Sequence, residues 1–113
     1  QNMVGNVKIS ARGPAGTTIR LRHAEMLNTN GTLYTENLRP ALATDTLILK
    51  GAGRETFEPH FTFHGFRFVE VIGYPGKLTP DDLRGVVITS DTPAGSCLPI
   101  GWARFITISM CRP

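Results

Sequence analysis

Ionisable side chains occur at two places in this 113-residue chain where they could do chemistry. In the first, His23 and Glu25 follow Ile19 and Leu21 at a spacing of two residues, so they continue a strand face that begins as apolar. Such a face can mark a strand that leaves the core toward a binding site or an interface. The more common alternative is a strand end that simply reaches solvent.

The second place is a phenylalanine-rich segment that contains His64 and Arg67. Gly65 lies between them and predicts a one-residue β-bulge, a feature that re-aims neighbouring side chains and often borders binding sites. Arg67 can instead be structural, as the ion-pair partner of a carboxylate such as Glu58 or Glu70.

Hydrolytic chemistry would need two carboxylates facing each other across a cleft, or a nucleophile beside a base. The carboxylates are spread along the chain, and the sequence places no two of them together. Asp81 and Asp82 follow Thr79 and Pro80, a pattern typical of a capped helical turn. The short motifs of serine hydrolases, phosphate-binding loops, zinc peptidases and calcium loops do not occur. We therefore expect no catalytic residue, no metal site and no cofactor.

The remaining composition narrows the class of protein. The net charge is only +3 and the basic residues are scattered, which does not favour nucleic-acid binding. No apolar run is long enough to span a bilayer. Cys97 and Cys111 have no His or Cys partner at metal-binding spacing, so they predict free thiols or a disulfide that closes the tail.

The elements that would position these side chains are short strands separated by glycine- and proline-rich turns. Apolar residues alternate at 7–11, 19–21, 47–49, 69–71 and 86–88. We predict an all-β fold, an antiparallel β-sandwich of the jelly-roll type, with one helical turn near 79–83. Residues 34–43 fit neither period, and Pro40 blocks a ladder, so they predict a long loop that crosses between sheets.

The phenylalanine-rich segment is predicted to anchor the sandwich core. Phe61 and Phe63 share one parity and Phe66 and Phe68 the other. A bulge at Gly65 would return all four rings to one face, because an inserted residue flips the side chains that follow.

Five separated blocks of the chain resemble, in the same order, a domain of bacterial α-L-rhamnosidases of glycoside hydrolase family 78. They are residues 1–5, 12–25, 31–39, 43–46 and 61–71. The resemblance runs from Gln1 to about Pro93. It implies a non-catalytic, concanavalin-like β-sandwich that precedes a helical (α/α)6 catalytic barrel.

Two departures from the family stand out. Asn6 occupies a position where a tryptophan is usual. Residues 94–113 resemble no part of the family, and we interpret them as a frameshifted, fused or cloning-derived end, to be tested by reading the encoding DNA in the adjacent frame. The expected organisation is a sandwich domain over 1–93 and an unmatched tail over 94–113.

The resemblance implies an accessory role. The parent enzyme would cleave terminal α-L-rhamnose with inversion, using barrel carboxylates that this chain lacks. The sandwich would pack on that barrel, be inactive alone and help to shape the sugar entrance. The polar residues expected at this carbohydrate or interdomain face are His23, Glu25, Glu36, Asn37, Arg39, Asp45, His64 and Arg67.

Two other functions remain open. A carbohydrate-binding module for rhamnosyl glycans would need aromatic platforms, and only Tyr34, Tyr74 and Trp102 are candidates if the phenylalanines fill the core. A protein-interaction domain could pair, or form a homodimer, through a sheet that the barrel normally covers. The sequence leaves the compartment undecided between cytoplasm and secretion.

Overall fold

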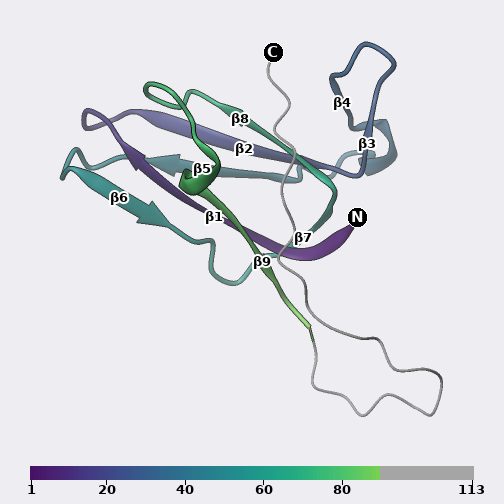
Figure 1. The fold of residues 1–113 in the computed structure, drawn as a ribbon. Helices are drawn as coiled ribbons and strands as arrows, with labels where there is room; N and C mark the ends of the chain where they lie inside the picture. The colour runs from purple at the N-terminus through teal and green to yellow at the C-terminus, as the bar shows by residue number, and fades with distance from the viewer. Residues whose placement is uncertain (90–113) are drawn as a thin grey trace.

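The computed structural model describes residues 1–89, which form short strands and two single turns of 3-10 helix (Figure 1). The strands are β1 (Met3–Arg12), β2 (Thr18–Ala24), β3 (Met26–Leu27), β4 (Leu33–Tyr34), β5 (Thr44–Ile48), β6 (Arg54–Phe57), β7 (His64–Phe66), β8 (Phe68–Ile72) and β9 (Leu83–Val87). The turns are η1 (Glu36–Leu38) and η2 (Pro80–Asp82). The predicted all-β class is confirmed.

Two antiparallel sheets make up the sandwich. In the first sheet, β1 pairs with β6, β7 and β9. Gly5 pairs with both His64 and Val87, and Ile9 with both Phe57 and Leu83, so β9 lies along one edge of β1 and β6 and β7 along the other. The second sheet has the order β5-β2-β8, and β3 and β4 form a separate small hairpin.

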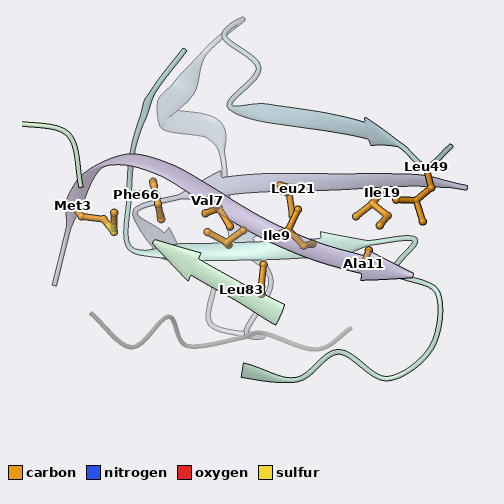
Figure 2. Packing of buried hydrophobic residues seen from close by; sticks show 10 residues of the cluster. Met3, Val7, Ile9, Ala11, Ile19, Leu21, Leu49, Phe66 and Leu83 are labelled. Atoms are coloured by element: carbon orange, nitrogen blue, oxygen red, sulfur yellow. The ribbon is translucent and has the colours of Figure 1, made fainter. Parts of the chain in front are cut away.

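The core lies between the two sheets, as the alternating pattern predicted. Val7, Ile9 and Ala11 of β1 are at most 1% exposed and face Ile19 and Leu21 of β2 (Figure 2). A strand points every second side chain to the same face, so this apolar alternation places one face of each strand in the core. The cluster also contains Met3, Leu49, Phe66, Val69 and Leu83.

The prediction that all four phenylalanines of the phenylalanine-rich segment face the core is wrong. Phe66 is 1% exposed, but Phe63 is 65% exposed and Phe61 lies fully in solvent, in the loop between β6 and β7. The alternation breaks at Arg67, between β7, which pairs with β1 in the first sheet, and β8, which pairs with β2 in the second. The Arg67 amide already donates to Ala24 O of β2, at 2.9 Å. A change of sheet, and not a bulge at Gly65, therefore interrupts the alternation.

Two local predictions can be compared with the structure. The predicted loop over 34–43 is confirmed in part: residues 35–43 carry no strand and contain η1, but Tyr34 belongs to β4. The loop does not cross between the two sheets of the sandwich, because it leads from the β3–β4 hairpin to β5, which pairs with β2 in the second sheet. The helical turn is η2, and the Asp82 carboxylate accepts hydrogen bonds from the Thr79 amide at 3.0 Å and the Thr79 hydroxyl at 2.7 Å. Asp82 therefore caps the turn, as expected.

Predictions on the tail, including those for Cys97, Trp102 and Cys111, fall outside the described residues. Asn6, which replaces the family tryptophan, is buried, and its Nδ2 donates to Pro59 O at 3.2 Å. Within residues 1–89, no helix is long and apolar enough to cross a membrane.

Candidate functional site

Three of the predicted residues meet in the interior as a histidine cluster, defined as His23 of β2, Asp45 of β5 and His64 of β7. His64 Nε2 lies 3.0 Å from Asp45 Oδ1, and His23 Nε2 lies 3.9 Å from Asp45 Oδ2. The two imidazole rings stack with their centroids 4.2 Å apart. The cluster joins the sheets, because His64 belongs to the first sheet and its two partners to the second.

Strand register explains why these side chains converge. His23 follows Ile19 and Leu21 on the inward face of β2 and is 1% exposed, so its interpretation as a strand end in solvent is wrong. Asp45 pairs with Leu21, and directly opposite residues project from the same face of a sheet. His64 reaches them from the facing sheet, where it pairs with Gly5.

The environment disfavours the charged form of His23. Burial lowers the pKa of His23, and the neighbouring His64 lowers it further, while the hydrogen bond to Ala43 O and the charge of Asp45 act in the opposite direction. His23 Nδ1 lies 3.2 Å from Ala43 O, so a neutral ring carries its proton on Nδ1. Its Nε2 then carries a lone pair and no proton. Within residues 1–89, neither this atom nor Asp45 Oδ2 has a hydrogen-bond partner.

A small pocket adjoins the cluster, between β2 and the loop of residues 35–43. It measures about 130 Å³ and is lined by Arg22, His23, Thr35, Leu38, Arg39, Ala41, Leu42, Ala43 and Thr44. Ligand pockets usually measure about 300–1,000 Å³, so this hollow can take a few waters or a small polar group but cannot enclose a sugar ring. The Arg22 guanidinium, which lines this pocket, also forms an ion pair with Glu70, with Nη1 2.7 Å from Oε2.

The other predicted residues do not join the cluster. Glu25, Glu36, Asn37 and Arg67 are exposed. Of the three site residues predicted on the loop, Glu36, Asn37 and Arg39, only Arg39 lines the pocket. Glu25 accepts a hydrogen bond from Asn2 at 3.4 Å.

The expected carboxylate partners of Arg67 are both taken by other residues. Glu70 pairs with Arg22 and Glu58 pairs with Lys8 at 3.1 Å. The Arg67 guanidinium lies 5.3 Å from the centroid of the Phe68 ring instead. The predicted carboxylate ion pair of Arg67 is therefore wrong.

Sequence reasoning missed a second polar site on the first sheet. A pocket of about 270 Å³ is lined by Lys8, Ser10, Thr56, Asp81, Asp82, Leu83 and Arg84. Lys8 and Arg84 are paired across β1 and β9, and Arg54 Nη2 lies 2.9 Å from Asp82 Oδ1. Because strand pairing brings these residues together, no local signal in the sequence could have shown this pocket.

Asp82 gives a pH-dependent prediction. Hydrogen bonds from the Thr79 side chain and amide, aided by Tyr74 and Arg54, lower the pKa of Asp82. A carboxyl whose pKa is lower in the folded than in the unfolded state stabilises the fold above the unfolded value, about 3.9, and this contribution is lost as the pH falls toward the folded value. We expect Asp82→Asn to be less stable than wild type at pH 6 and the gap to shrink near pH 3.

Urea unfolding at the two pH values measures this gap. Asp81→Asn is the matched control, because Asp81 is the exposed neighbour and its side chain makes no hydrogen bond or ion pair within residues 1–89. Equal losses in the two variants, or a gap for Asp82→Asn that does not depend on pH, would contradict the assignment.

Comparison with known proteins gives consistent matches. Residues 1–89 match the family model described as the bacterial alpha-L-rhamnosidase concanavalin-like domain. An alpha-L-rhamnosidase of Streptomyces avermitilis is 60% identical over 93 residues, which is 82% of this chain and 9% of the relative. One from Formosa agariphila is 44% identical over 89 residues, covering 77% of this chain and 10% of the relative.

A solved structure agrees in fold. The crystal structure of the Streptomyces avermitilis alpha-L-rhamnosidase complexed with L-rhamnose superposes with a TM-score of 0.79, covering 82% of this chain and 9% of that one. The chain therefore spans about a tenth of the length of the relatives it matches.

Proposed function

Since the chain belongs to the bacterial alpha-L-rhamnosidase concanavalin-like domain family, as its sequence blocks predicted, we propose that it is an accessory sandwich that packs on the catalytic part of such an enzyme. The observation that carries this proposal is the match of 82% of the chain, at 60% identity, to only 9% of a solved relative. The cleavage of terminal α-L-rhamnose then belongs to the remainder of the parent protein.

The packing face that we propose is the outer side of the first sheet at one end of β1, defined by Val4, Phe63 and Ile88. These side chains are between 42% and 65% exposed. They lie together at that end, because the Ile88 amide donates to Val4 O and Val4 pairs with Gly65, two residues after Phe63. Exposed apolar patches of this kind usually mark interaction surfaces.

Among the polar candidates, we propose that Glu36, Asn37 and Arg39 make the contacts outside the domain, because all three are exposed on one short loop. His23, by contrast, is buried and Asp45 is largely buried, so they act inside the sandwich.

Five of the eight carboxylates within residues 1–89 are engaged inside the domain, and the other three, Glu25, Glu36 and Asp81, are exposed. This engagement supports a domain that is inactive alone. Glu55 accepts hydrogen bonds from the amides of Lys50, Gly51 and Ala52, and hydrogen bonding to the amides lowers its pKa. Asp82 caps η2, and the other engaged carboxylates are Asp45, Glu58 and Glu70. An acid–base pair needs two carboxyl groups that are free to exchange protons with a substrate.

A domain exchange tests the packing face. Residues 1–89 replace the matching segment of the Streptomyces avermitilis relative, and hydrolysis of p-nitrophenyl α-L-rhamnoside is measured. We expect the hybrid to stay folded and active, and the Val4→Asp/Ile88→Asp hybrid to lose most activity. Met26→Asp is the control, since Met26 is an exposed apolar residue outside this face, at 58% exposure. An active double variant, or turnover by this chain alone, contradicts the proposal.

Binding of carbohydrate is the second candidate, and the exposed rings of Phe61 and Phe63 favour it. Both rings were predicted to lie in the core, but they are exposed and provide flat apolar surfaces on which a sugar ring can stack. Calorimetric titration with L-rhamnose and a rhamnosylated flavonoid tests it. Saturable heat that disappears in Phe61→Ala would support a binding module, and the absence of heat would leave the packing role.

A further inference from the structure

We propose that the histidine cluster is a binding site for a divalent transition metal ion, with Zn²⁺ the ion that suits its donors. This inference concerns the interior of the sandwich and does not depend on the proposed function. His23, Asp45 and His64 each offer one ligand atom, and the three atoms lie within 4.8 Å of one another. Two imidazoles and one carboxylate are ligands that Zn²⁺ takes in proteins.

The orientation of His23 matches that of a metal ligand. A ligating histidine normally donates its other ring N–H to a carbonyl or carboxylate, which fixes the ring and leaves one lone pair for the metal. His23 Nδ1 is held by Ala43 O in this way, and the side chain is fully buried. Its Nε2 therefore presents a lone pair to the interior of the cluster.

The cluster also contains two atoms without a hydrogen-bond partner in the described part of the chain. His23 Nε2 and Asp45 Oδ2 are buried and face each other at 3.9 Å. Both are acceptors when His23 is neutral, and unpaired buried acceptors are costly. A proton on Nε2 does not resolve this, because 3.9 Å exceeds hydrogen-bond distance. A cation between the two atoms satisfies both.

The distances are compatible with Zn²⁺ after a small adjustment. Tetrahedral zinc, with bonds of about 2.0–2.2 Å, holds neighbouring ligand atoms roughly 3.4 Å apart, and the Nε2–Oδ2 separation is 3.9 Å. The His64 ring must turn on binding, because two rings stacked at 23° do not direct their lone pairs to one point. His64 is the more accessible of the two histidines, at 12% side-chain exposure against 0% for His23, so it is the ligand expected to turn.

The consequence of such a site is structural. His64 belongs to the first sheet and the other two ligands belong to β2 and β5 of the second, so the ion would clip the two layers together. Binding to the folded state alone stabilises it by mass action.

The test uses the full chain, treated with a chelator, in a Cys97→Ser/Cys111→Ser background that removes the thiols as competing ligands. Zn²⁺ is titrated by calorimetry, and thermal unfolding is followed at increasing Zn²⁺. We expect one Zn²⁺ per chain and a Tm that rises by several degrees at about 100 times Kd. Asp45→Asn and His64→Ala should each weaken binding about tenfold or more. His60→Ala, which changes the exposed third histidine, should bind as before.

A second readout does not depend on the variants being folded. Nitrogen-15 spectra of the histidine rings in the same background distinguish Nδ1 from Nε2, and we expect Zn²⁺ to shift His23 Nε2 and one nitrogen of His64 while His60 is unchanged. No saturable binding, or shifts confined to His60, would overturn the proposal. Equal affinity in folded Asp45→Asn and wild type would overturn it as well.

Discussion

Replacement of Phe66 by alanine is expected to lower the free energy of unfolding by about 3–5 kcal/mol, the range for deleting a buried ring. Phe66 is 1% exposed and is the largest fully buried side chain within residues 1–89. Its ring also meets the His23 ring edge to face, with centroids 4.9 Å apart. The loss therefore combines apolar burial with the cavity left beside the histidine cluster, and it is a large part of the stability of a small domain.

The chain supplies a matched control for this prediction. Phe63 lies three residues earlier and is 65% exposed, so Phe63→Ala should change stability by less than about 0.5 kcal/mol. Urea unfolding of the two variants and the wild type gives the comparison. An unchanged midpoint for Phe66→Ala, or equal losses in both variants, would refute the placement of Phe66 in the core.

Gly5→Ala is expected to cost about 3 kcal/mol or more, at the upper end for forcing atoms into packed structure. A Cβ built on Gly5 would lie 1.9 Å from the carbonyl oxygen of Val86 in β9. That oxygen is backbone and cannot rotate away as a side chain could. The alanine therefore has to push β1 and β9 apart where they pair.

Gly65→Ala is the control, because Gly65 lies in the neighbouring strand and pairs with Val4, next to Gly5. A Cβ on Gly65 meets only Glu25 Oε1 at 3.8 Å, an ordinary contact. Alanine there should be neutral or slightly stabilising, since glycine is the less favourable residue in a strand. Thermal unfolding measures both variants. A Gly5→Ala protein with the wild-type Tm would show that β9 does not approach β1 as closely as described.

Both substitutions also act on the histidine cluster. Phe66 packs against His23, and Gly5 is the residue with which His64 pairs. If the proposed metal site is correct, each variant should also bind Zn²⁺ more weakly, because its ligands depend on the same packing.

Local patterns in the sequence predicted the all-β class, the inward face of β1, the capped turn at Thr79 and the family. Each depends on residues that are close in the chain: the alternation of Val7, Ile9 and Ala11, or the Thr79–Asp82 spacing. Such patterns reflect backbone geometry, which repeats every two residues in a strand whatever the strand packs against. The family followed from several blocks in order, which need no contact information.

Tertiary structure alone decided where the phenylalanines lie and which polar residues meet. The sequence holds Phe61, Phe63, Phe66 and Phe68 in one stretch, but the change of sheet at Arg67 and the loop before β7 leave only Phe66 fully buried. All three cluster residues were candidates, yet they lie on strands distant in sequence, and their meeting depends on strand register and on the packing of two sheets. Register is set by the summed burial of whole strands, so no local pattern records it, and the histidine cluster became visible only in the folded chain.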